Sequence, residues 1–261
     1  MPAALLKREA RLERQEGIPQ KHANLPAMEP EVLAVSPSGK ARLISREEMA
    51  NLPIRRYEGN VCVIATPQDL DRAQADILQE HVVGLDTETR PAFKKGEKHL
   101  PCLVQIATGS AAYLFQLRRT DGLPLIARLL SEPRIIKAGV ALAHDLRELK
   151  LVFPFTERGV LDLGVLARRC GLEQTGVRNL AGMFLGWRVP KGARTSNWAT
   201  PRLTSQQISY AATDAWICRE LFLRFKELGL VQRMDVEKGA VKSIDAKEGR
   251  KDGNQDLNPD S

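Results

Sequence analysis

The sequence predicts an α/β domain in which a set of strands comes first and helices pack around it. Short apolar segments of strand length alternate with helical segments in the first half of the chain, and the rest is mostly helical. A capping signal then marks one long final helix. We expect a single domain at residues 56–235, with a partly extended arm at residues 1–55 and a disordered tail at residues 236–261.

The first half of the domain alternates strands and helices. Thr66 and Pro67 supply an N-cap and a proline at the first helical position, so a helix follows the first strand. Gly109 and Ser110 mark a turn between two later strands, which we expect to form a hairpin or meander beside the first pair. The expected strands cover residues 61–65, 81–87, 102–108, 111–117 and 134–138, and the expected helices cover residues 67–79 and 123–131.

The second half consists mainly of helices, and the final one has the clearest start. Thr204 and Gln207 form a capping box, while Leu203 and Ile208 stand at the positions of a hydrophobic staple. Gly229 is a suitable residue for the C-terminal cap of this helix. The expected helices cover residues 141–152, 163–170 and 177–186, followed by the final one, which runs to about residue 228.

Charge and cysteine content narrow the class of protein. The chain of 261 residues carries a formal net charge of +7, which favours a polyanionic partner without establishing one. No segment reaches the roughly 18 apolar residues of a membrane span, and the N-terminus lacks the apolar region of a secretory signal. We therefore expect a soluble protein of the cytoplasm. The cysteines lie in apolar stretches without CxxC spacing and are expected to be reduced thiols: Cys62, Cys102, Cys170 and Cys218.

One apolar strand turns acidic at its end, at Asp86 and Glu88. Residues two apart in a strand point to the same face, so these carboxylates lie side by side where a buried strand reaches the surface. Like charges this close raise each other's pKa unless a cation lies between them, and oxygen-rich clusters suit hard cations such as Mg²⁺ or Mn²⁺. Two solvated acids at a strand end are the simpler alternative when the pair is considered alone.

Tyr210 and Asp214 stand four residues apart on the final helix and therefore share one face. The helix around them is apolar, and an acid in such surroundings needs a partner because a buried unpaired charge is costly. A core tyrosine whose hydroxyl reaches solvent is the alternative explanation for Tyr210.

A third acid, Asp145, follows the segment Lys137-Ala138-Gly139 after five intervening residues. Gly139 permits a tight turn from strand to helix. Asp145 then lies in the first turns of an otherwise apolar helix, where the helix dipole favours an anion. Stabilisation of that helix end would by itself account for an acid at this position.

The three motifs together resemble the DEDD superfamily of 3′-5′ exonucleases, in its tyrosine-bearing branch. The order is Asp-x-Glu on a strand, Lys-x-Gly followed by a helical Asp, and Tyr-x-x-x-Asp on a late helix. Within that superfamily the chain is most similar to the group of ribonuclease D and Werner-type exonucleases. The likeness covers roughly residues 61–230 and includes two further segments, Leu103-Val104-Gln105-Ile106-Ala107 and Ser196-Asn197-Trp198.

This resemblance implies a ribonuclease H-like fold, with a mixed central sheet flanked by helices, and a two-metal-ion 3′-5′ exonuclease. The enzyme would use two Mg²⁺ or Mn²⁺ ions, act on single-stranded DNA or RNA and release nucleoside 5′-monophosphates. Asp86 would bridge the two metals, and Asp145 would hold the second one. Glu88 and Asp214 would complete the site that activates water, which Tyr210 would orient. No signature position departs from the family pattern.

Two basic loops are expected to flank the acidic site and to hold phosphates. One follows the strand of Asp86 and the other precedes the final helix, and solvated loop charges are the alternative. Trp198 either stacks a base or is a buried residue that fixes its loop. The expected nucleic-acid contacts are Arg90, Lys94, Lys95, Arg188, Lys191, Arg194, Asn197 and Trp198.

Two other functions fit parts of the pattern. His144 beside Asp145 suggests a metal phosphohydrolase of the HD type, but that chemistry needs several His ligands and the chain has only four widely separated histidines. An inactive nucleic-acid-binding module is the alternative from a different class, although binding alone does not require the complete set of acids.

No motif separates DNA from RNA as substrate, or indicates the oligomeric state or the role of the N-terminal arm. Because no large module follows residue 229, we expect a small stand-alone exonuclease rather than a full ribonuclease D architecture. Transfer-RNA ends, short oligonucleotides and damaged DNA are all compatible substrates.

Overall fold

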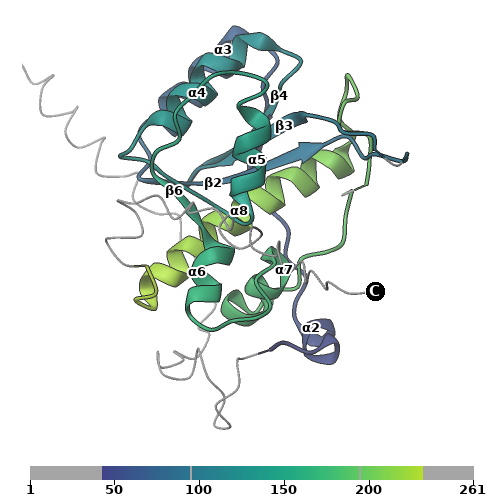
Figure 1. Ribbon diagram of the computed structural model, residues 1–261, viewed down its shortest axis with the longest axis vertical. Helices are drawn as coiled ribbons and strands as arrows, with labels where there is room; N and C mark the ends of the chain where they lie inside the picture. Colours follow the sequence, from purple (N-terminus) through teal and green to yellow (C-terminus); the bar gives the residue numbers. More distant parts are fainter. Residues whose placement is uncertain (1–42, 95, 194, 232–261) are drawn as a thin grey trace, which may run out of the picture.

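A mixed six-stranded sheet with helices on both faces forms the domain (Figure 1). The computed structural model describes residues 43–94, 96–193 and 195–231. The strands follow one another across the sheet in the order β1-β4-β3-β2-β5-β6, which confirms the expected α/β class. They are β1 (Asn60–Val63), β2 (Val82–Thr89), β3 (Pro101–Ala107), β4 (Ala111–Gln116), β5 (Ile136–Gly139) and β6 (Val160–Asp162).

The middle of the sheet is antiparallel, and its two flanks are parallel to their neighbours. β2, β3 and β4 form an antiparallel meander, as the turn signal predicts. β1 pairs in parallel with β4, and β5 and β6 continue in parallel from β2. β6 was not among the predicted elements, because a segment of 3 residues is too short to show the period of a strand.

Three helices cover one face of the sheet and enclose the larger apolar core. Val83 and Leu85 of β2 point to this face and are fully buried. Because side chains alternate along a strand, the residues between and beyond them face the opposite side. The helices are α3 (Pro67–Ile77), which Thr66 caps as predicted, α4 (Leu123–Ser131), which follows the short turn η2 (Thr120–Gly122), and α5 (Leu142–Leu149).

The opposite face is crossed by α8 (Ser205–Glu227), which meets the sheet backbone to backbone at Gly84. A Cβ on Gly84 would lie 1.8 Å from the carbonyl oxygen of Ala215 and 2.9 Å from the backbone nitrogen of Arg219. Any other residue would therefore force the helix away from β2. This contact brings α8 close to β2 just before the strand turns acidic.

Both ends of α8 agree with the sequence signals. The Thr204 hydroxyl accepts a hydrogen bond from the backbone nitrogen of Gln207, whose side chain accepts one from the Thr204 nitrogen, which completes the predicted capping box. At the other end Gly229 adopts a left-handed φ of +68°, and the Leu230 nitrogen donates to the Phe225 carbonyl over 2.9 Å. The helix that carries two of the predicted site residues is thus fixed at both ends.

The helices of the second half pack against α8 and the β5–β6 edge of the sheet. They are α6 (Leu163–Arg169) and α7 (Val177–Leu180). The predicted helix at residues 177–186 is only partly correct, because the chain widens after α7 into a π-type turn, η3 (Ala181–Leu185), and ends in a left-handed Gly186.

A further helix, α2 (Arg46–Asn51), lies within the predicted N-terminal arm. Ser45 and Glu48 form its capping box. The sequence contains this signal, but the helix is too short to show an apolar periodicity. The segment packs on η3, since a Cβ on Gly182 would lie 2.6 Å from the Met49 side chain and 2.8 Å from that of Ile44.

The predicted division of the chain is only partly accessible to the structure. Residues 1–42, and with them most of the predicted arm, lie outside the described residues, as does the predicted tail at residues 236–261. The boundaries of arm, domain and tail therefore stay predictions. In the described ranges, no helix combines the length and the apolar character that crossing a membrane requires.

Candidate active site

Asp86 and Glu88 lie on β2 beside α8. Both side chains point to the face that α8 crosses, because they alternate with Leu85 and Thr87 along the strand. Glu88 is buried and Asp86 is partly exposed. β2 stays paired with β3 through this stretch, with Asp86 opposite Gln105, so the backbone beneath both acids is held in register.

Asp214 of α8 completes a cluster with the two strand acids. One carboxylate oxygen from each of Asp86, Glu88 and Asp214 lies within 4.8 Å of the other two. Asp214 is buried, and the hydroxyl of Tyr210, one helical turn earlier, hydrogen-bonds to its carboxylate. The structure therefore brings the strand motif and the helix motif to one point.

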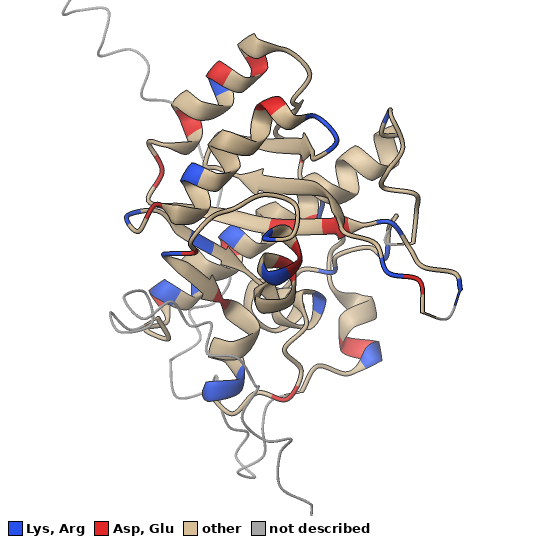
Figure 2. Cartoon of the chain, turned by 45° about the horizontal axis from the view of Figure 1, so that its top comes forward, with Lys and Arg blue, Asp and Glu red and all other residues tan. Residues whose placement is uncertain are grey.

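Asp145 approaches the same point from α5, on the other side of β2. Its carboxylate hydrogen-bonds to the side chain of Thr87, and its charge contributes to the raised pKa of Asp86. The start of α5 is held by buried Asp162, whose Oδ2 accepts a hydrogen bond from the Leu142 nitrogen over 3.0 Å. All four predicted acids thus gather at the acidic end of β2, which lies near the centre of Figure 2.

The turn from β5 into α5 is built differently from the prediction. Gly139 is needed because a Cβ there would lie 2.5 Å from the Leu85 carbonyl oxygen, which would push β5 away from β2. The left-handed residue of the turn is instead Ala141, with φ of +62°. A left-handed conformation costs a residue with a Cβ about 1–2 kcal/mol, so the surrounding contacts must hold Ala141 in place.

Burial raises the pKa values of Asp86, Asp145 and Asp214, and repulsion from the other acids adds to that of Asp86. Burial, followed by the charges of the other three acids, raises the pKa of Asp86 well above its usual value. Burial also raises the pKa of Asp145 to about 7 and that of Asp214 to about 6, although the hydrogen bond from Tyr210 lowers the latter. Burial and the charge of Asp214 keep Tyr210 protonated by raising its pKa. A cation would relieve this repulsion.

The available ligand atoms fit a hard divalent cation. The cluster consists of carboxylates, and Oδ1 of Asp214 is buried with no hydrogen-bond partner in the described part of the chain. Carboxylate oxygens that lack protein partners are the ligands that such cations prefer. His144 is exposed and does not join the cluster, so nothing in the described ranges supports a site of the HD type.

Arg178 of α7 acts electrostatically on the acidic cluster and was not predicted from the sequence. Its positive charge lowers the pKa of both Asp214 and Tyr210. Its Nη2 donates to the Pro190 carbonyl oxygen over 3.3 Å. An arginine inside a short helix belongs to no local motif, so only the folded arrangement reveals its position.

Gln105 is a second polar residue at the site. The family pattern contains this residue but gives it no role. It is fully buried on β3 opposite Asp86, and paired residues of antiparallel strands point to the same face. Neither polar atom of its side chain has a hydrogen-bond partner among the described residues. A buried amide without partners is costly, which indicates that this carboxamide serves the site rather than the core.

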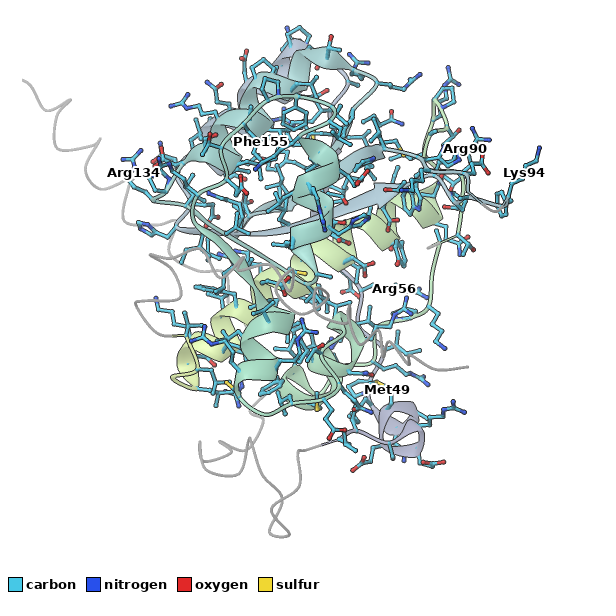
Figure 3. The ribbon with its side chains drawn as sticks, in the orientation of Figure 1. Met49, Arg56, Arg90, Lys94, Arg134 and Phe155 are labelled. Atoms are coloured by element: carbon cyan, nitrogen blue, oxygen red, sulfur yellow. The ribbon has the colours of Figure 1, made fainter. Side chains whose placement is uncertain are left out.

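The predicted phosphate-binding residues differ in how they are presented. Arg90, Lys94 and Lys191 are exposed, and Figure 3 shows Arg90 and Lys94 projecting from the same side of the molecule. Arg188 is half-buried, and its backbone forms a bridge to Ile54. Two further predicted contacts lie outside the described residues: Lys95 and Arg194.

Trp198 has no exposed face on which a nucleobase could stack, so the structure contradicts its predicted contact with a base. Its side chain is fully buried against Leu103 of β3 and Ala211 of α8, and its ring centroid lies 5.9 Å from that of Tyr210. The structure thus shows the buried alternative, in which the tryptophan anchors its loop. The exposed side chain of Asn197 accepts a hydrogen bond from the backbone two residues later.

Comparison with known proteins points to one family. The sequence model of a family described as 3′-5′ exonuclease matches residues 61–229. A human exonuclease mut-7 homolog is 30% identical over 205 residues, which cover 67% of this chain and 23% of that protein. Ribonuclease D of Haemophilus influenzae is 32% identical over 148 residues, which cover 55% of this chain and 36% of that one. The chain therefore matches well under half the length of these two relatives.

A solved structure has the same fold. Ribonuclease D of Trypanosoma brucei, in complex with the RNA U12, superposes with a TM-score of 0.59 at 20% sequence identity. The match covers 69% of this chain and 65% of that one. Together with the observed strand order, it confirms the expected ribonuclease H-like fold with a mixed sheet.

Proposed function

Because the chain belongs to the 3′-5′ exonuclease family, whose model matches residues 61–229, we propose that it removes nucleotides from the 3′ end of single-stranded DNA or RNA. Each cycle hydrolyses one phosphodiester bond and releases one nucleoside 5′-monophosphate. One observation carries the proposal. Carboxylate oxygens of Asp86, Glu88 and Asp214 lie within 4.8 Å of one another, and the Tyr210 hydroxyl hydrogen-bonds to Asp214.

The four acids are the proposed ligands of two divalent cations, Mg²⁺ or Mn²⁺. Asp86 would be a ligand at both positions, with Glu88 and Asp214 completing one and Asp145 the other. When bound, such a pair supplies an activated water, a neutralised phosphate and a stabilised leaving oxygen. The contribution of the chain is to hold the carboxylates at fixed positions on β2, α5 and α8.

Tyr210 is the proposed group that orients the attacking water, which assigns the chain to the tyrosine-bearing branch of the DEDD superfamily. Its hydroxyl stays protonated at neutral pH, because burial and Asp214 raise its pKa. A protonated hydroxyl can donate to a carboxylate and accept from water in the same position. Arg178, whose charge acts on Asp214, is a further proposed contact for a phosphate oxygen of the substrate.

The exposed cations Arg90, Lys94 and Lys191 are the proposed phosphate contacts of the strand that enters the site. We extend the same proposal to Lys95, Arg194, Arg188 and Asn197, which belong to the same two loops.

DNA and RNA are both candidate substrates, and the RNA bound to the related Trypanosoma brucei structure supports RNA as one of them. The free cysteines support a location in the reducing cytoplasm.

A product ladder tests the function. Matched single strands of DNA and RNA, labelled at the 5′ end, are incubated with the protein and Mn²⁺ or Mg²⁺. We expect products that shorten one nucleotide at a time from a free 3′ end and not from a blocked one, with nucleoside 5′-monophosphates in the supernatant. Relative rates on the two sugars then give the preference.

Asp86→Ala should abolish the ladder, whereas Asp121→Asn, which changes an acid away from the cluster, should leave it intact. The absence of metal-dependent cleavage on every strand would contradict an exonuclease. Tight binding of the strands without cleavage would instead establish a nucleic-acid-binding module.

A further inference from the structure

The loop at residues 90–100, which joins β2 to β3, presents an aromatic side chain to solvent directly beyond the acids. Phe93 is 81% exposed, more than any other large hydrophobic residue in the described part of the chain. β2 and β3 remain paired as far as Thr89 and Pro101, so the loop starts at the edge of the candidate active site. Figure 2 shows it extending away from the acidic end of the strand.

Local hydrogen bonds fix the backbone of the loop while the Phe93 ring stays in solvent. The Oε2 of Glu97 accepts from the Phe93 nitrogen over 3.2 Å and from the Lys94 nitrogen over 3.4 Å. Its Oε1 lies 2.9 Å from Nε2 of His99. Glu97 therefore links both sides of the loop, and the Phe93 side chain belongs to no apolar core among the described residues.

Basic residues lie close to Phe93 in the same loop. Arg90, Lys94 and Lys98 are exposed and form no salt bridge with any residue that the structure describes. Figure 3 shows Arg90 and Lys94 on the outer edge of the molecule, on the side where the loop projects. An isolated exposed apolar residue is common and needs no explanation. An exposed aromatic ring among unpaired cations, next to a nuclease site, matches the composition of single-strand binding grooves.

We propose that Phe93, flanked by Arg90 and Lys94, is a stacking site for one nucleobase of the substrate strand, upstream of the bond that is cut. This inference rests on the proposed function and adds a substrate subsite to it. Aromatic rings stack on every base, whereas the neighbouring cations contact the phosphates on either side. The subsite would therefore select for strand length and single-strandedness, and not for sequence.

The position of Phe93 limits which nucleotide it can reach. It follows Glu88 by five residues, so its backbone lies at most about 17 Å from that acid. At the 3.4 Å spacing of stacked nucleotides, this distance corresponds to at most about five nucleotides from the 3′ end. The proposed subsite takes a base beyond the second nucleotide, so a dinucleotide at the acids would not use it, whereas a strand of about eight nucleotides can reach it.

Affinity as a function of strand length tests the proposal. Strands from two to ten nucleotides, carrying a fluorescent label and a non-hydrolysable 3′-terminal linkage, are titrated by fluorescence anisotropy, and cleavable versions give KM and kcat. For Phe93→Ala we expect the Kd of the ten-nucleotide strand to rise at least about fivefold, since stacking of one base has an effect of this size. The constants for the dinucleotide should not change.

Two further variants separate stacking from other roles of the side chain. Phe93→Trp should retain or improve the affinity for the long strand, whereas Phe93→Leu, apolar but without an aromatic face, should lose it. Leu151→Ala is the matched control, because Leu151 is 68% exposed and lies just beyond the far end of α5. That variant should bind every strand as the unaltered protein does.

Several results would overturn the subsite. They are an unchanged Kd for Phe93→Ala at all lengths, an equal loss for the dinucleotide and the long strand, and full affinity of Phe93→Leu. The first or third result would leave Phe93 free for contact with a protein. If the unaltered protein cleaves no strand, the proposed function fails, but the anisotropy series still decides whether Phe93 binds bases.

Discussion

The acidic cluster and the two basic loops are neighbours in space, but the chain builds them in opposite ways. The acids lie on a strand and two helices, and most of their surface is buried. The described basic residues of the loops lie outside helices and strands, and Arg90, Lys94 and Lys191 are exposed. Asp86 and Glu88 depend on the register between β2 and β3, whereas Lys94 and Lys191 depend on no such pairing.

This difference follows from what each region has to do. Carboxylates that share cations must be held at fixed distances, which regular elements supply and loops do not. Residues that bind the phosphates of any strand need charge and reach, and a variable geometry is an advantage there. Substitutions in the cluster should therefore change the rate of the chemical step, while substitutions in the loops should change affinity and its salt dependence.

The largest expected effect comes from removing one ligand of the cluster. Asp214→Asn should lower kcat on a single strand by more than about a hundredfold, because a neutral amide cannot balance the charge of bound cations. The matched loop variant is Glu97→Ala, which removes an acid that lies outside the cluster. If the two variants lose activity equally, the contrast between the regions is wrong.

Tyr210→Phe should have the next largest effect. The ring stays in place and only the hydroxyl that bonds to Asp214 is lost, so we expect kcat to fall by about ten- to a hundredfold with little change in KM. Steady-state kinetics on one strand measures both constants. A raised KM with an unchanged kcat would assign Tyr210 to substrate binding instead.

The stability of the metal-free protein should depend on pH through the acids of the cluster. Burial raises the pKa of Asp145 from its ordinary value of 3.8 to about 7 in the fold, so its contribution to stability is complete below about pH 4 and is lost as the pH rises through 7. The free energy of unfolding in EDTA should therefore decrease from about pH 4 to pH 7. Asp145→Asn should flatten that decrease, and denaturant titrations of both proteins measure the difference.

A buried lysine contributes to the same pH profile. Burial lowers the pKa of Lys137 to about 7, so this residue makes the protein more stable as the pH rises above 7, and the difference between the two proteins is the quantity to compare. An identical pH profile for both proteins would show that burial does not raise the pKa of Asp145.

Binding of the metal should stabilise the fold. Mn²⁺ at about a hundred times its Kd should raise the Tm of the unaltered protein at pH 8 by roughly 5–10 °C.

The smallest expected effect is that of a single loop cation. Lys191→Ala should weaken strand binding a few-fold and reduce the slope of log K against log salt by about one, with kcat on a dinucleotide unchanged. Anisotropy titrations between 50 and 200 mM salt provide the slope. A drop in kcat on the dinucleotide would mean that this lysine takes part in the chemistry.

Local sequence signals predicted the regular elements that carry the site. The alternation of β2 placed Asp86 and Glu88 on one face, and the capping box at Thr204 fixed the phase of the helix with Tyr210. These signals depend on neighbours in sequence, which is why they can be read without the fold. The meeting of the acids was expected from the family resemblance and not from spacing alone, since it joins residues on three separate elements.

Other features depend on contacts between distant segments and leave no local signal. The burial of Trp198 follows from its packing on β3 and α8, and the electrostatic effect of Arg178 on Asp214 follows from the docking of α7. The left-handed turn at Ala141 is similar, because an alanine gives no reason to expect it. Phe93 is the reverse case, since it is 81% exposed and belongs to no apolar core among the residues that the structure describes.

The backbone contact between Gly84 and α8 has a consequence for directed evolution of this protein. Position 84 allows one amino acid, because even a methyl group would meet the Ala215 carbonyl and lift the helix that carries Asp214. A library that diversifies the core near this contact would consist mostly of inactive clones, even where the proteins fold. Substitutions in the loops at residues 90–100 and 188–198 would instead change which nucleic-acid strands bind. They would leave the distances between the acids unchanged.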